Sequence, residues 1–115
     1  MEKDAKIYVA GHRGMVGSAI CRALNNAGYH HIMQRTRQEL DLICQQEVEA
    51  FFKEEKPTYV FLAAARVGGI LANSTHPADF IYQNLMIQNN VIHCAYTSGV
   101  KKLVFLGSSC IATKK

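Results

Sequence analysis

Three glycines spaced three residues apart follow the first apolar run of the chain: Gly11, Gly14 and Gly17 in the string Gly-His-Arg-Gly-Met-Val-Gly. The run before them, residues 6–10, is short and β-prone. The segment after them, residues 15–27, repeats apolar residues every three or four positions, as one face of a helix does. A strand that turns into a helix on glycines leaves the first N–H groups of the helix free to bind phosphate. The turn therefore predicts a nucleotide-binding strand–helix unit, although a tight turn without a ligand has the same spacing.

The rest of the chain continues the alternation of short apolar runs and helical periods. Further strands are predicted at residues 30–34, 58–64 and 103–106, and further helices at 42–56 and 79–98. The continuous apolar character of 58–64 and 103–106 indicates strands buried on both faces. The alternation predicts an α/β fold, a Rossmann-like parallel sheet with helices on both faces. We expect it to be incomplete, with about four strands in the order 3-2-1-4 and an apolar fourth strand at the edge.

The composition and charge of the chain limit the kinds of ligand and partner that we expect it to bind. The 115 residues suffice for one domain, and the formal net charge of +4 comes from dispersed basic residues, which suits a small anionic ligand and predicts no nucleic acid partner. No apolar run is long enough for a membrane span, and the polar start does not resemble a signal peptide. The cysteines lack the spacing of a metal site, so we predict no metal and reduced thiols in a cytoplasmic protein. They are Cys21, Cys44, Cys94 and Cys110.

The end of the second predicted strand indicates which dinucleotide binds. It reads Gln34-Arg35-Thr36-Arg37 and lacks the acidic residue that would bind the ribose hydroxyls of NAD. Arginines suit a 2′-phosphate because they bind it through charge-assisted hydrogen bonds. Arg13, in the glycine turn, is placed to reach the same group. We therefore predict NADP rather than NAD; arginines that are only solvated surface charges are the alternative.

A serine pair, Ser108 and Ser109, follows Gly107 at the carboxyl end of the fourth predicted strand. Ligands of open parallel sheets bind beyond the carboxyl ends of the strands, so a hydroxyl there can donate to a substrate carbonyl during hydride transfer. Serines at this position are also common as turn residues and helix caps. The pair alone leaves both interpretations open.

Several segments resemble the GDP-L-fucose synthase family, within the extended short-chain dehydrogenase/reductase superfamily. They are Ala10–Ile20, Arg35–Leu40, Ala63–Ile70, Asn73 with Pro77–Asn84, and Phe105–Ile111. That family epimerises GDP-4-keto-6-deoxy-D-mannose and reduces its ketone with NADPH. The resemblance therefore implies an oxidoreductase and isomerase of GDP-L-fucose biosynthesis, with NADP as cofactor, a GDP-sugar as substrate and a homodimeric assembly.

The same resemblance implies which residues form the site. The cofactor-binding positions are Gly11, His12, Arg13, Gly14, Met15, Val16, Gly17, Arg37, Gln38, Glu39, Leu40, Asp41, Leu42, Ala63, Ala64, Ala65, Leu106, Gly107 and Ser109. Two positions are catalytic by resemblance. Ser108 matches the serine that polarises the keto oxygen, and Cys110 matches the cysteine of the epimerisation, where a thiol suits proton transfer beside a carbonyl.

The resemblance ends at Ile111. The family continues with Tyr-Pro, whereas this chain continues with Ala-Thr-Lys-Lys. The family's Tyr-x-x-x-Lys pair is also absent, since the residues four positions after the tyrosines are His12, Met33, Ala63, Met86 and Val100. We expect residues 1–111 to be the N-terminal part of an NADP-binding domain, 112–115 to be a divergent tail, and the substrate domain to be absent. A chain truncated in this way is expected to show little or no turnover alone.

Two other interpretations stay open. The chain is alternatively a non-catalytic nucleotide-binding fragment, or a half that a second polypeptide completes, which the apolar edge strand favours. It is alternatively another NAD(P)-dependent sugar-nucleotide epimerase or dehydratase, against which the segment Val67-Gly68-Gly69-Ile70 argues.

Overall fold

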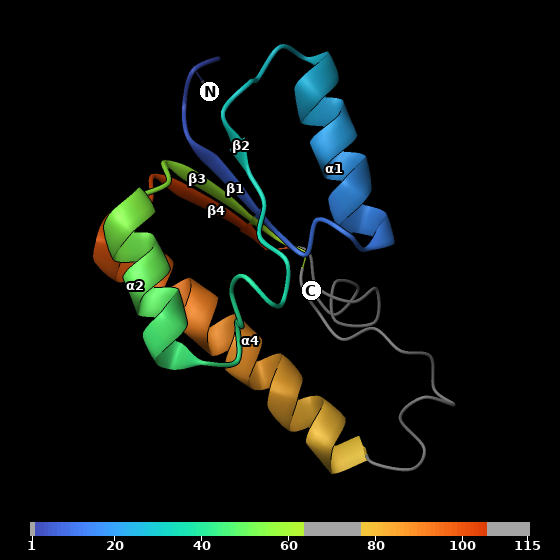
Figure 1. The fold of residues 1–115 in the computed structure, drawn as a ribbon, viewed down its shortest axis with the longest axis vertical. Helices are drawn as coiled ribbons and strands as arrows, with labels where there is room; N and C mark the ends of the chain where they lie inside the picture. The colour runs from blue at the N-terminus through green and yellow to red at the C-terminus, as the bar shows by residue number, and fades with distance from the viewer. Residues whose placement is uncertain (1, 64–76, 106–115) are drawn as a thin grey trace, which may run out of the picture.

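The computed structural model describes residues 2–63 and 77–105, in which strands and helices alternate (Figure 1). The elements are β1 (Ile7–Ala10), α1 (Met15–Asn26), β2 (Ile32–Met33), α2 (Gln45–Glu55), β3 (Tyr59–Leu62), α4 (Pro77–Ser98) and β4 (Lys102–Phe105). Each lies within a predicted segment or close to its bounds. All strand pairs are parallel. The predicted α/β fold with a four-stranded parallel sheet is therefore confirmed.

The order of the strands differs from the predicted 3-2-1-4. It is β2-β1-β3-β4, so that β1 lies between β2 and β3. The short β2 pairs with β1 at only two positions, whereas β1 pairs with β3 along four. A four-residue strand finds a matching edge on β1 and not on β2, so the crossover through α2 leads the chain back past β1. The direction of winding therefore reverses between β1 and β3, which makes their carboxyl ends the switch point of the sheet.

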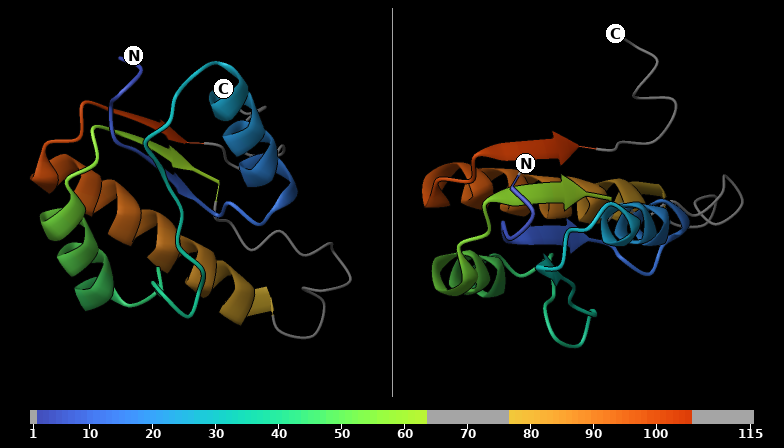
Figure 2. Two further views of the ribbon diagram at one scale, coloured as in Figure 1. Left: turned by 45° about the horizontal axis from the view of Figure 1, so that its top comes forward. Right: turned by 90° about the horizontal axis from the view of Figure 1, so that it is seen from above.

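Helices cover both faces of the sheet, as predicted: α1 lies on one face, and α2 and α4 lie together on the other (Figures 1 and 2). Successive side chains of a strand point to opposite faces. Tyr8 and Ala10 of β1 accordingly pack in the larger core cluster, with α2 and α4, while Ile7 and Val9 pack with Leu24 of α1. All four residues of β1 are buried, which identifies β1 as the centre of the core.

The edge strand β4 is less buried than predicted. Leu103 and Val104 are partly buried, and Lys102 and Phe105 are exposed. Within the part of the chain that the structure describes, β4 pairs only with β3, and α1 packs over β1 and β2 instead. The expectation of a strand buried on both faces is therefore wrong for β4. The expectation of an edge strand with apolar residues is confirmed.

Candidate dinucleotide-binding site

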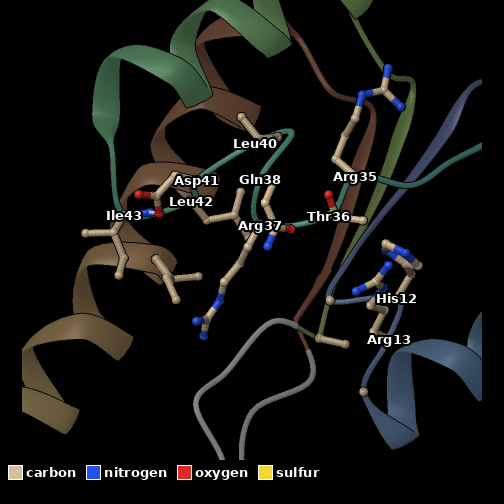
Figure 3. Close-up of a pocket in the computed structure, with 14 residues that line it drawn as sticks. His12, Arg13, Arg35, Thr36, Arg37, Gln38, Leu40, Asp41, Leu42 and Ile43 are labelled. Atoms are coloured by element: carbon tan, nitrogen blue, oxygen red, sulfur yellow. Dashed lines mark hydrogen bonds between the residues drawn. The ribbon is translucent and has the colours of Figure 1, made fainter.

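A pocket of about 550 Å³ lies at the carboxyl ends of β1 and β3, where the winding of the sheet reverses (Figure 3). Its lining comes from four parts of the chain: the turn Gly11–Gly14, most of the loop from Arg35 to Ile43, Ala63 directly after β3, and Ile87 of α4. Open α/β sheets bind their ligands at this position, and the volume is in the range of small-molecule sites. The pocket is therefore the candidate site of the molecule.

The glycine turn has two glycines that the fold requires and one that it does not. Gly11 has a φ of +87°, which favours glycine. A Cβ on Gly17 would lie 1.9 Å from the carbonyl oxygen of Gly11, because α1 packs directly against the turn. A Cβ on Gly14 would lie 3.6 Å from the same oxygen, which is ordinary contact. The fold therefore leaves room for a side chain at Gly14, and the glycine leaves that space open to a ligand.

The start of α1 is open to the pocket. Gly14 is the N-cap residue of α1, and no side-chain hydrogen bond caps the helix. The first N–H groups of a helix have no partner inside the helix, and together with the helix dipole they favour an anion. This end of the pocket is therefore suited to a phosphate group.

Three arginines line the pocket, and they are not equivalent. Arg35 is held elsewhere: its guanidinium forms an ion pair with Glu55 at 3.7 Å and lies 5.2 Å from the ring centre of Phe51. Arg37 extends from its loop toward the centre of the pocket, and Arg13 faces it from the glycine turn (Figure 3). Within residues 2–63 and 77–105, neither Arg13 nor Arg37 has a recorded ion pair or hydrogen-bond partner. Both guanidinium groups are available for a phosphate.

The loop that carries Arg37 is attached to the core at its far end. Asn90 of α4 donates hydrogen bonds from Nδ2 to the carbonyl oxygens of Leu42, at 2.8 Å, and Ile43, at 3.0 Å. Asn90 is 6% exposed and is the only buried polar residue in the described part of the chain. Leu40, 5% exposed, packs in the larger core cluster. Two anchors therefore keep this wall of the pocket in place.

The predicted cofactor positions fall into three groups. Ten of them line the pocket: Gly11, His12, Arg13, Gly14, Arg37, Gln38, Leu40, Asp41, Leu42 and Ala63. Four lie in the described structure without lining it: Met15, Val16, Gly17 and Glu39. The remaining positions, including both predicted catalytic residues, lie outside the described residues: Ala64, Ala65, Leu106, Gly107, Ser108, Ser109 and Cys110.

Four lining residues are not among the predicted positions: Arg35, Thr36, Ile43 and Ile87. Thr36 and Ile43 adjoin predicted positions, so treating the loop as continuous would have included them. Ile87 comes from the buried face of α4 and has no local signal, because an apolar residue at helical spacing indicates core and nothing more.

Membrane-spanning helices, metal clusters and cysteines can also be assessed among the described residues. None of their helices is both long and apolar enough to cross a lipid bilayer. Among the same residues, no three His, Cys, Asp or Glu side chains gather as a metal site would require. The described cysteines, Cys21, Cys44 and Cys94, are free thiols.

Comparison with known proteins agrees with this geometry. Residues 7–115 match the family model described as NAD dependent epimerase/dehydratase family. The chain is 64% identical over 113 residues to GDP-L-fucose synthase 1 of Arabidopsis thaliana, covering 98% of this chain and 35% of that protein. It is 56% identical over 109 residues to GDP-L-fucose synthase of Escherichia coli K12, covering 95% and 34%.

A solved structure is similar as well. A GDP-mannoheptose C4 reductase from Campylobacter jejuni with NADP bound has a TM-score of 0.89 at 55% identity, over 93% of this chain and 34% of that one. The chain thus spans about a third of the length of the relatives it matches. The family model, in contrast, covers nearly all of the chain, from β1 onward. The chain belongs to the NAD dependent epimerase/dehydratase family.

Proposed function

We propose that this chain is the NADP-binding part of a GDP-L-fucose synthase-like epimerase and reductase. The observation that carries the proposal is the pocket at the switch point, whose lining combines Gly14 at the uncapped start of α1 with Arg13 and Arg37, two arginines without an ion pair among the described residues. The fucose synthases of two organisms and an NADP-bound GDP-sugar reductase are similar to the chain throughout its length. They support the same ligand and a GDP-sugar as substrate.

Two features of the pocket fit a dinucleotide. The space that a Cβ of Gly14 would fill lies open beside the start of α1, so a pyrophosphate can approach the backbone closely. In addition, Nδ1 of His12 is buried and has no hydrogen-bond partner within the described residues. Buried polar atoms usually have partners. A ligand in the pocket lined by His12 is one source of such a partner.

Each part of the pocket has a role in this proposal. The turn Gly11–Gly14 and the start of α1 bind the pyrophosphate through N–H groups, and Arg13 and Arg37 bind the 2′-phosphate. NADPH supplies a hydride when it is bound. Ser108 would donate a hydrogen bond to the keto oxygen of GDP-4-keto-6-deoxy-D-mannose, and Cys110 would exchange protons at the neighbouring carbons. We expect weak or no turnover from the chain alone, because it contains no Tyr-x-x-x-Lys pair.

A charge reversal tests the assignment of the cofactor. We expect Arg37→Asp to weaken NADPH binding by about 10- to 100-fold and to leave NADH binding nearly unchanged, because a charge-assisted contact to the 2′-phosphate is lost. Arg22→Asp is the matched control, since Arg22 is exposed on α1 and does not line the pocket. Titration of each purified variant with both dinucleotides measures the effect. An unchanged preference in Arg37→Asp would contradict the proposal.

A reductase of another GDP-4-keto sugar is the second candidate. The heptose C4 reductase is 55% identical to the chain, close to the 56% of the Escherichia coli fucose synthase. This candidate shares the cofactor site and differs in whether epimerisation precedes reduction. Adding the chain to a polypeptide that supplies the rest of the fold, and assaying solvent deuterium exchange into the keto sugar, separates the two candidates: exchange requires epimerase chemistry.

Assembly as a homodimer is also part of the proposal. Four large apolar side chains are exposed along one face of α4: Tyr82, Leu85, Ile92 and Tyr96. No Lys, Arg, Asp or Glu lies between the first and last of them, so a second copy can pack against the same face without charge repulsion. Light scattering should find a dimer that Leu85→Glu converts to a monomer.

A location in the cytoplasm is also part of the proposal, and the free thiols of the described cysteines support it.

A further inference from the structure

Thr36 and Glu39 form a reciprocal pair of hydrogen bonds beside the pocket. The N–H of Thr36 donates to Oε1 of Glu39 at 2.8 Å, and the N–H of Glu39 donates to Oγ1 of Thr36 at 3.3 Å. This pattern usually starts a helix. Here the next described helix, α2, begins only at Gln45, so the pair closes an isolated turn. The N–H of Leu40 also donates to the carbonyl oxygen of Thr36, at 2.8 Å, and completes the turn.

The tip of this turn carries the residues that face the pocket. Arg37 and Gln38 lie between the paired residues, and both line the pocket, whereas Glu39 does not. An arginine side chain has several rotatable bonds, and holding it in one arrangement costs rotamer entropy. A fixed backbone at Arg37 limits where its guanidinium can reach. The hydrogen bonds of Glu39 therefore affect Arg37 without contacting a ligand.

The charge of Glu39 would by itself disfavour a phosphate in this pocket. The hydrogen bond from the Thr36 N–H lowers the pKa of the Glu39 carboxyl, slight burial opposes this, and the Thr36 hydroxyl, Arg35 and His12 lower it further. The carboxylate is therefore ionised at neutral pH. A negative charge next to an anion site weakens anion binding. The presence of Glu39 is explained if its hydrogen bonds to Thr36 favour phosphate binding more than its negative charge disfavours it.

We propose that Glu39 is a positioning residue: together with Thr36 it holds Arg37 where it meets the 2′-phosphate, and it thereby sets the preference for NADP over NAD. The inference rests on the proposed function, because it takes NADP as the ligand of the pocket. It differs from the family-based prediction, in which Glu39 binds the cofactor itself.

Two variants of Glu39 separate position from charge. Glu39→Gln removes the charge but keeps an oxygen that accepts from the Thr36 N–H, whereas Glu39→Ala removes both. Titrations of the purified full chain with NADPH and NADH give the ratio of the two affinities. We expect Glu39→Gln to keep or increase the wild-type ratio, and Glu39→Ala to lower it about five- to tenfold. Charge removal alone would raise the ratio in both variants, so the two accounts differ in sign for Glu39→Ala.

A second pair of variants is available at Thr36. Thr36→Ser keeps the accepting hydroxyl and should behave as wild type, while Thr36→Val loses it and should shift the ratio in the same direction as Glu39→Ala. The control for charge is Glu54→Ala, because Glu54 is exposed on α2 and does not line the pocket. Glu39 is exposed as well, so its replacement should leave the circular dichroism spectrum unchanged.

Each outcome decides the inference. A ratio that rises or stays constant in Glu39→Ala contradicts the inference alone, since wild-type binding of NADPH would still support the proposed function. A wild-type chain that binds neither dinucleotide contradicts the proposed function and the inference together. A lower ratio in both Glu39→Ala and Thr36→Val, with Glu39→Gln at or above the wild-type ratio and Thr36→Ser at that ratio, supports the inference.

Discussion

The glycine turn holds its shape through its backbone, whereas the loop from Thr36 to Ile43 holds its shape through side-chain hydrogen bonds. The turn owes its shape to two glycines that admit no side chain, Gly11 by its positive φ and Gly17 by its contact with the Gly11 carbonyl. The loop owes its shape to side-chain hydrogen bonds, among them those of Asn90. The turn and the loop therefore have different roles in the proposed function. In the proposed function, the turn binds the pyrophosphate, and Arg37 of the loop, together with Arg13, binds the 2′-phosphate that distinguishes NADP from NAD.

The largest effect on stability is expected at Gly17, where the glycine turn and the packing of α1 depend on the same close contact with the Gly11 carbonyl. Gly17→Ala would place Cβ 1.9 Å from the oxygen and 2.6 Å from the carbon of the Gly11 carbonyl, both of them backbone atoms that cannot rotate away. We expect a loss of about 3 kcal/mol in the free energy of unfolding. Urea unfolding followed by circular dichroism measures it. A urea midpoint equal to that of wild type would contradict the claim that the contact of Gly17 with Gly11 fixes the shape of the turn.

A smaller effect is expected at the anchor of the loop. Asn90→Leu fills a similar volume but leaves the carbonyl oxygens of Leu42 and Ile43 without their partner, which should cost about 2 kcal/mol. Asn89→Leu is the matched control, since Asn89 is exposed on the same helix and should change stability by less than about 0.5 kcal/mol.

Hydrogen exchange locates the effect of Asn90→Leu in the chain. The amides of residues 40–44 should exchange faster in Asn90→Leu, while those of the glycine turn stay as in wild type. Equal changes in both walls would mean that Asn90 supports the core in general and not the loop in particular.

Local patterns predicted the elements of the fold but not their order in the sheet. The apolar period of residues 15–27 and the apolar run of 58–64 depend on neighbours in sequence, so both elements were found. Whether β3 pairs with β1 or with the outer edge of β2 depends on contacts between segments far apart in the sequence, which local patterns do not contain. The exposure of β4 likewise depends on which element covers it, and that is a tertiary property.

The residues of the candidate site also fall into those that local motifs predict and those that they do not. Gly11, Gly14 and Arg37 belong to local motifs and were predicted, and the structure places all three in the lining. Asn90 acts on residues 47 and 48 positions away, so its contribution had no signal in the sequence around it. Glu39 was predicted as a contact by resemblance, while its hydrogen bonds in the structure are to Thr36.

Gly14 offers the most direct test of the central claim, that the pocket at the switch point is an NADP site. A Cβ at this position meets no atom closer than 3.6 Å, so Gly14→Ala should change the free energy of unfolding by less than about 1 kcal/mol. The same Cβ would stand where a pyrophosphate approaches the turn. Calorimetric titration with NADPH should therefore give an affinity about tenfold weaker, or worse, than that of wild type. NADPH affinity equal to wild type in a folded Gly14→Ala variant would contradict the account.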